Sequence, residues 1–492
     1  MNKRTIWCAL LWAAAGSSFL GCNDEGAPAS VVDPAPDDDG DNGDPMTGDM
    51  ARVRVWHLAA AAGDVDVLIN GEPALEDFEF EANTDYIDVP AGSLDVAVAP
   101  AGMSAAIIED AFALGADERW TIVVAQLQEA GGFAFLPIQE DTSALNAGAI
   151  AFRFFHAAYA VPTAVDVHNA SDPTLPELID GIAQGEVATE RLEVPNAAYD
   201  FGLDADDDGI IDFVTGMPIA MPAAGASVTV GAISAPGEAG ATETKIVFLV
   251  NSGSDIHDEV DLETAEFGAI RFWHLAAALG TVDIFMNGVA VAPGIDFKAN
   301  SPFTNFLVGS YDIAIGPAGM TAEEALITSP GFVLGADQSF TLLATQLNVD
   351  ETAGGALRVL PIEEDTTAPA PGNIRFRVFR VFHASYAVDQ PVSIHSIDGG
   401  ANPEVVEAVE QGAVAPAPGL ELPSAAYTLG VDVGDDGIID FETAEPVAMP
   451  PDGALITIGA VSEPGQSSDE TSLILLVNDD PTLGDTIALV PF

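Results

Sequence analysis

Residues 53–67 read VRVWHLAAAAGDVDV, and this stretch decides the fold of the chain. Successive side chains of a β-strand point to opposite faces, so Val53, Val55 and His57 share one face. Val65-Asp66-Val67 shows the same alternation after a short loop of small residues. The stretch therefore predicts two consecutive strands, the first of which turns His57 toward the same core as its two valines.

The centre of this stretch, Arg-x-aromatic-His, occurs four times in the chain. The four copies are Arg54–His57, Arg153–His156, Arg271–His274 and Arg380–His383. Longer segments recur only in alternate copies, since Pro100–Met103 returns as Pro317–Met320 and Gly209–Phe213 returns as Gly437–Phe441. Such self-similarity is the signature of tandem structural units. The order is A-B-A-B, and we name the units A1, B1, A2 and B2.

These repeats divide the 492 residues into seven predicted segments. They are a signal peptide over 1–21, an acidic tether over 22–50, A1 over 51–145, B1 over 146–252, an acidic linker over 253–267, A2 over 268–368 and B2 over 369–492. Each unit has roughly 100 residues, close to the commonest domain size.

Within each unit, apolar runs of four to eight residues alternate with turn residues. Examples are Leu94–Val98, Trp120–Ala125, Val228–Ile233, Ile246–Val250 and Leu473–Val477. About seven strands in about 100 residues predicts an all-β chain of tandem immunoglobulin-like β-sandwiches. Asn70-Gly71 and Asn287-Gly288 predict tight hairpins. Only residues 103–111 and 403–411 favour a short helix.

The motif also suggests a family. Arg-x-aromatic-His, the following Val-Asp-Val strand and Pro90-Ala91-Gly92 resemble DUF4397, a domain of unknown function found in bacterial surface and envelope proteins. The resemblance covers residues 51 to 482 and is clearest in A1 and A2. It implies an envelope location and supplies no catalytic residues.

Charge and cysteine content exclude several classes of protein. The chain has 77 acidic and 14 basic residues, a formal charge of −63, so nucleic acid and anionic lipid surfaces would be repelled. Both cysteines lie within the first 22 residues, which excludes a disulfide framework in the folded part. No nucleophile elbow, zinc-protease or phosphate-loop motif occurs. We therefore expect a protein that is not an enzyme, with a hydrolase as the least favoured alternative.

The N-terminus predicts export and lipid anchoring. Lys3-Arg4, the apolar run over 6–15 and the small residues after it form a secretory signal. Phe19–Cys22 resembles the lipobox of bacterial lipoproteins, although that family prefers Leu where this chain has Phe19. The resemblance implies acylation of Cys22, with Asn23 next to it favouring the outer membrane of a Gram-negative cell. The predicted partner is thus a membrane, reached through a lipid anchor.

The acidic loops of the B units predict calcium sites. Calcium loops place oxygen ligands at positions 1, 3, 5, 7 and 9 with glycine at 6. In B1 these ligands are Asp204, Asp206, Asp208, the backbone of Ile210, and Asp212. In B2 the counterparts are Asp432, Asp436 and Asp440, with glycine at the third position. The alternative is an acidic hairpin tip that binds no cation.

The repeated motif itself has two open interpretations. The His is either a strand-end side chain hydrogen-bonded to a nearby loop, which we favour, or a metal ligand. On the opposite face, the Arg and aromatic side chains either support the structure or present Trp56 and Trp273 as an exposed platform for sugars. The predicted function is a calcium-stabilised, lipid-anchored surface module for binding, adhesion or scaffolding of an envelope protein or glycan. The alternative is a carbohydrate-binding module.

Overall fold

The computed structural model describes residues 49–129, 131–236, 242–250, 259–347, 356–364, 367, 369–380, 390–398, 403–410, 412–449, 453–461, 472–477 and 480–491. Contacts divide the chain into two compact units. The first contains A1 and B1 up to Glu263, except for residues 168–177 and 200–202; the second contains those two segments and the chain from Thr264 onward. Signal, tether and Cys22 lie outside the described residues.

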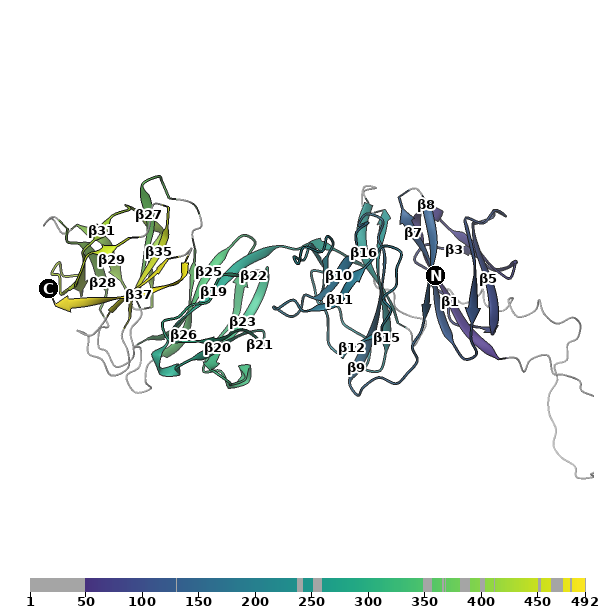
Figure 1. The fold of residues 1–492 in the computed structure, drawn as a ribbon, viewed down its shortest axis with the longest axis horizontal. Helices are drawn as coiled ribbons and strands as arrows, with labels where there is room; N and C mark the ends of the chain where they lie inside the picture. The colour runs from purple at the N-terminus through teal and green to yellow at the C-terminus, as the bar shows by residue number, and fades with distance from the viewer. Residues whose placement is uncertain are drawn as a thin grey trace, which may run out of the picture. The chain divides into compact units, whose positions relative to one another are not determined.

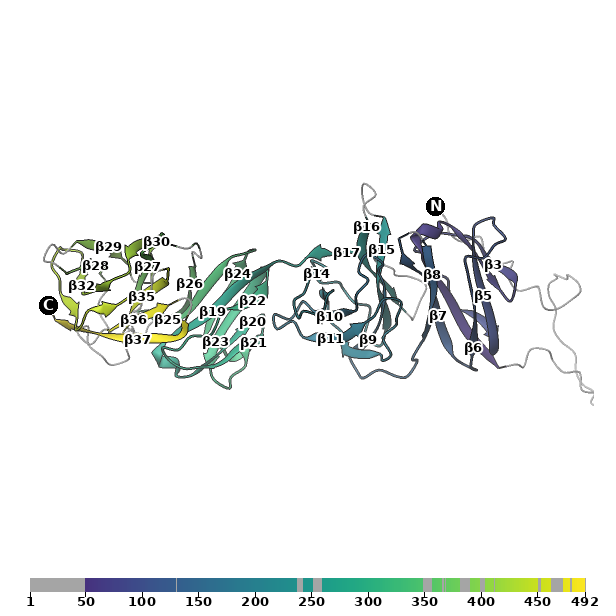
Figure 2. The ribbon, with the colours of Figure 1, turned by 45° about the horizontal axis from the view of Figure 1, so that its top comes forward.

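A1 is a sandwich of two four-stranded sheets (Figure 1). One sheet has the order β4-β1-β7-β8 and the other β3-β2-β5-β6. The strands are β1 (Met50–Leu58), β2 (Val65–Ile69), β3 (Glu72–Phe78), β4 (Ile87–Pro90), β5 (Gly92–Pro100), β6 (Ile108–Leu114), β7 (Arg119–Gln128) and β8 (Gly131–Gln139). Val53 and Val55 lie in the core between the sheets, as the alternation predicts. Figure 2 shows β3 and β5 in a layer separate from β7 and β8.

A2 repeats this topology with the orders β22-β19-β25-β26 and β21-β20-β23-β24. Its strands are β19 (Phe267–Leu275), β20 (Val282–Met286), β21 (Val289–Ile295), β22 (Thr304–Leu307), β23 (Gly309–Pro317), β24 (Ile327–Leu334), β25 (Ser339–Leu347) and β26 (Ala356–Glu363). In both A units the first strand runs parallel to the seventh, which places Trp56 beside Val123 and Trp273 beside Leu343.

B1 has two five-stranded sheets, β11-β10-β13-β14-β18 and β12-β9-β15-β16-β17. The strands are β9 (Ala149–Ala157), β10 (Val165–Asn169), β11 (Glu177–Ile182), β12 (Leu192–Pro195), β13 (Phe201–Asp204), β14 (Phe213–Val214), β15 (Ser227–Pro236), β16 (Thr242–Val250), β17 (Glu259–Asp261) and β18 (Glu263–Thr264). Residues 253–267 were predicted to be a linker. Instead, β17 pairs with β16, and β18 lies at the edge of the other sheet. Acidic side chains there alternate with Val260, so the segment completes B1 rather than leaving it.

B2 joins its two layers into one nine-stranded sheet, β29-β28-β32-β33-β37-β36-β35-β27-β30, with β31 and β34 as a separate pair. The strands are β27 (Asn373–Arg380), β28 (Val392–Ser396), β29 (Glu404–Val409), β30 (Val414–Pro423), β31 (Ala426–Tyr427), β32 (Leu429–Val433), β33 (Phe441–Thr443), β34 (Val447–Ala448), β35 (Leu455–Val461), β36 (Ser472–Val477) and β37 (Asp480–Pro491). β37 pairs with β36 and β33, so one strand does in B2 what β17 and β18 do in B1.

Both predicted helices are wrong, because strand pairing outweighs local helix propensity. Residues 103–111 contribute to β6, where Ile108 lies opposite Val98, and residues 403–411 contribute to β29, where Val409 lies opposite Val392. The helices in the described part of the chain are the 3₁₀ turns η1 (Ala60–Ala62), η3 (Ala277–Leu279) and η4 (Ala322–Glu324). Among the described residues, no helix is long and apolar enough to cross a membrane.

Candidate functional site

Arg54 of the first motif is buried in a charged and aromatic cluster. Its side chain is 2% exposed, and the side chain of Glu140, its partner at 3.4 Å, is 6% exposed. Thr121 links the two: its Oγ1 accepts a hydrogen bond from Arg54 Nε at 2.7 Å and donates one to Glu140 Oε1 at 2.5 Å. The guanidinium carbon also lies 4.7 Å from the centre of the Tyr86 ring. Burial raises the pKa of Tyr86 to about 12, so this ring faces Arg54 as a neutral phenol.

A2 builds the same cluster from matching positions. Arg271 donates from Nε to Thr341 Oγ1 at 2.7 Å and approaches Glu364 at 3.3 Å, while Phe303 replaces the tyrosine with its ring centre 4.6 Å from the guanidinium. The sequence analysis overlooked both acids. The signal was present, because a Glu follows two residues after each repeated Leu-Pro-Ile, at Glu140 and Glu364.

The motif histidines of A1, B1 and A2 are buried and bonded to nearby loops, as the favoured interpretation predicted. Nε2 of His57, His156 and His274 lies 2.8, 2.8 and 2.6 Å from a backbone oxygen of Gly63, Val161 and Gly280, respectively. Nδ1 of each accepts a backbone N–H two residues later in the chain. Burial lowers the pKa of all three rings, outweighing the carbonyl bonds that raise it. These rings are therefore neutral loop anchors, with both nitrogens occupied.

The prediction of an exposed tryptophan platform is wrong. Trp56 and Trp273 are both 0% exposed. Trp56 packs with residues of A1 and also with Phe155, Val247 and Leu249 of B1. The outer face of a strand is polar or exposed only where nothing covers it, and here a second sandwich does.

The fourth motif is displaced from its predicted position. β27 pairs with β35 so that Phe379 lies opposite Gly459, just as Phe155 lies opposite Gly231 in B1. The register therefore places residues 377–379 where B1 has Arg153–Phe155. The predicted copy, Arg380–His383, continues into residues outside the described part. The overlapping sequence Arg-Val-Phe-Arg-Val-Phe-His allows both readings, and only strand register separates them.

The B1 acidic loop is organised around Asp204, which is 0% exposed. Its Oδ1 accepts the backbone N–H groups of Asp206 and Asp207 at 3.2 and 2.8 Å, and its Oδ2 accepts that of Gly209 at 2.7 Å. These bonds, opposing the effect of burial, lower the pKa of Asp204. Gly209 has φ +82°, the left-handed conformation that position 6 requires.

Three of the predicted B1 ligands converge. Asp204, Asp206 and Asp212 each offer a carboxylate oxygen within 4.8 Å of the others. Asp208 lies close enough for its charge to be the main cause of a raised pKa at Asp206. The side chain of Ile210 is exposed, and its backbone N–H binds Asp208 Oδ1. Asp166 was not predicted, yet its buried carboxylate lies within 4.8 Å of that of Asp204.

The B2 loop has the same backbone and fewer charges. Asp432 is 0% exposed and accepts the N–H groups of Asp436 and Gly437 at 3.2 and 2.8 Å. Asp440 accepts the N–H of Val433, as Asp212 accepts that of Ala205. Ser393 stands in place of Asp166 and donates to Asp435 at 2.8 Å. The B1 loop therefore has the denser set of oxygens for a divalent cation.

Residues 51–168 and 268–390 match the model of DUF4397, a domain of unknown function. The chain carries two DUF4397 domains. Each DUF4397 match spans one A sandwich and continues into the first strands of the following B sandwich. The first DUF4397 match thus includes the motifs of both A1 and B1.

Other comparisons add little. No curated protein matches the chain. Among solved structures, the Bacillus anthracis TIE protein matches with 11% identity over 81% of this chain, at a TM-score of 0.13. This chain covers 65% of the length of that one.

Proposed function

We propose that the chain is a non-enzymatic, lipid-anchored protein of the cell envelope whose tandem sandwiches act as a surface scaffold or binding module, with calcium stabilising the B sandwiches. The observation that carries this proposal is the use of the motif side chains. In A1, B1 and A2 the motif Arg and His side chains bind other groups of the protein, and the buried tryptophans offer no surface to a ligand. The repeated chemistry thus supports the architecture, which is what a scaffold requires.

The anchor is tested by fractionation of cells producing the full chain. Replacing Cys22→Ser removes the only thiol that follows the signal sequence, so we expect the protein to leave the membrane fraction. The matched control is Cys8→Ser, which removes the other thiol, inside the apolar run, and should leave the protein in the membrane fraction. Membrane association of the Cys22→Ser protein would contradict the anchor.

Calcium is expected to raise the unfolding temperature of the mature chain. A ligand that binds only the folded state stabilises it by about 2.7 kcal/mol at a hundred times its dissociation constant. We expect Asp206→Asn to abolish the calcium effect, because Asp206 converges with Asp204 and Asp212. In chelator the same substitution should itself stabilise B1, since the charge of Asp208 disfavours an ionised Asp206.

The neighbouring residue supplies the control for calcium. Asp207 lies in the same loop with φ +59°, a conformation that asparagine adopts readily, and it is not at a ligand position. Asp207→Asn therefore removes one charge without removing a ligand, and the calcium effect should persist. Equal loss in both variants would indicate a general response to negative charge and would refute the site.

A further inference from the structure

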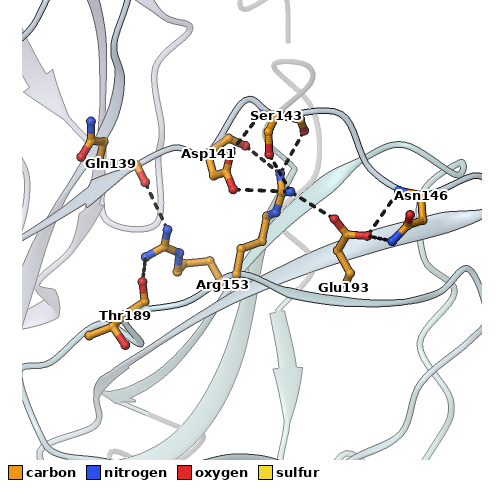
Figure 3. A network of polar contacts seen from close by, with 8 residues as sticks. Gln139, Asp141, Ser143, Asn146, Arg153, Thr189 and Glu193 are labelled. Carbon is orange, nitrogen blue, oxygen red and sulfur yellow. Dashed lines mark hydrogen bonds and ion pairs between the residues drawn. The ribbon is translucent and has the colours of Figure 1, made fainter.

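The motif arginines of A1 and B1 reach into each other's sandwich. Arg54 of A1 donates from a terminal guanidinium nitrogen to the backbone oxygen of Val250 at 3.2 Å, and Arg153 of B1 donates to that of Gln139 at 3.4 Å (Figure 3). Val250 ends β16 and Gln139 ends β8, and these strands are equivalent in the two sandwiches. Each arginine thus binds the end of the other sandwich's matching strand, which is the reciprocity of a two-fold interface.

The aromatic residues of the two motifs meet between these bonds. The rings of Trp56 and Phe155 lie 5.9 Å apart at 81°, an edge-to-face contact. Leu58, Val123 and Ile138 of A1 and Ile233, Val247 and Leu249 of B1 complete one apolar cluster. The face that follows the motif strand is therefore buried in both sandwiches.

The two faces are complementary rather than identical. In the A units the tryptophan lies beside a large residue, Val123 or Leu343. In the B units the phenylalanine lies opposite a glycine, Gly231 or Gly459. A Cβ on Gly231 would lie 1.9 Å from the Phe155 ring, so only glycine lets this ring lie against its own sheet. The B face is accordingly lower where the A face is higher.

Charge explains why arginines occupy the joint. Two acidic sandwiches repel each other, and the mature chain has only 14 − 2 = 12 basic residues after loss of Lys3 and Arg4. Three of them, Arg54, Arg153 and Arg191, lie at the A1–B1 joint. Arg191 binds the backbone oxygens of Asp141 and Ser143 and the carboxylate of Glu193, holding the connecting segment against B1 (Figure 3).

The second half of the chain has matching elements. Trp273, Leu275, Leu343 and Ile362 of A2 form a cluster with Leu360 and with Val414 of B2. Arg375 binds Thr367 in the connecting segment and Glu421 in B2, the counterpart of Glu193. A different residue thus makes the contacts that Arg191 makes in the first half.

We propose that the Arg-x-aromatic-His face is a recognition surface for a neighbouring sandwich of the complementary kind, so that A1 selects B1 and A2 selects B2. The arginine bonds set the register, and the Trp face against the Phe–Gly face specifies A with B rather than two like units. The working unit of the chain is then a locked A–B pair.

The pairing is tested by distances between spin labels on A1 and B1 in the mature chain carrying Cys22→Ser. Labels are attached at cysteines replacing the exposed Ser104 and Ala223, and double electron–electron resonance gives the distance distribution. We expect one narrow distribution in the parent. Gly231→Val, which lifts Phe155, and Arg153→Gln, which removes the bond to Gln139, should each broaden it.

Arg52→Gln is the matched control, because Arg52 is on the same strand face as Arg54 but binds Asp88 in solvent. It should leave the distribution narrow. Hydrogen exchange of β2, β5, β10 and β13 in the same samples shows whether each sandwich remains folded. If Gly231→Val unfolds B1, Arg153→Gln decides the question, since it leaves no acid unpaired. A broad parent distribution, or a narrow one in Arg153→Gln, would overturn the proposal.

Discussion

Replacing Arg54→Met is expected to destabilise A1 by about 3–5 kcal/mol, the usual cost of leaving one member of a buried ion pair uncompensated. Glu140 would remain 6% exposed with Thr121 as its described donor. Hydrogen exchange of β1 and β7 in the mature chain measures the loss locally, which matters because four sandwiches do not unfold in one two-state transition.

Two comparisons identify the cause of that loss. Arg54→Met combined with Glu140→Leu removes both charges, and we expect it to recover most of the stability, because an apolar pair of similar volume often replaces a buried ion pair at little cost. Arg52→Gln breaks an exposed pair, 52% and 63% exposed, and should cost no more than about 1 kcal/mol. A double variant as unstable as Arg54→Met would show that the guanidinium acts through packing or its bond to Val250, not through Glu140.

Replacing Trp56→Ala is also expected to cost about 3–5 kcal/mol, as for other large aromatic residues removed from a core. Trp56 is 0% exposed and belongs to a cluster shared by A1 and B1, so exchange should increase in both β7 and β15. A tryptophan presented to sugars on the surface would lose little stability when removed.

Trp56→Phe separates the ring from its nitrogen. Among described atoms, Trp56 Nε1 has no hydrogen-bond partner, whereas Trp273 Nε1 donates to the backbone oxygen of Lys298 at 3.2 Å. Phenylalanine should therefore be tolerated better at position 56 than at 273, where a bond worth about 1 kcal/mol is lost. Equal costs at the two positions would contradict this assignment of the indole nitrogens.

Much of the architecture followed from local pattern. Alternation predicted the strands at Trp120–Ala125 and Val228–Ile233, and Asn70-Gly71 predicted a hairpin, confirmed by φ +52° and +80° at these residues. The loop position of His57 also followed, because its face was shared with core valines. Glycine spacing likewise predicted the turn around Asp204. These features depend on residues close in sequence, where side-chain period and turn conformation are decided.

Other features depended on contacts between distant segments. Nothing near Trp56 indicates that B1 covers it, so one strand face was predicted to be exposed when it is buried. Likewise, the acidic residues 253–267 resemble a linker until β16 supplies a pairing partner, and the fourth motif shifts by three residues only when Gly459 is opposite Phe379.

The sequence by itself determined that this chain is a tandem repeat of all-β units with an Arg-x-aromatic-His strand in each A unit and in B1. Period and turn residues suffice for that, because they act within a few residues. The tertiary structure alone decided that Arg54 and Trp56 join A1 to B1. The reason is that burial of the outer face of a strand depends on what packs against it, and here the covering surface comes from β9, β15 and β16, about 100 to 200 residues further along the chain.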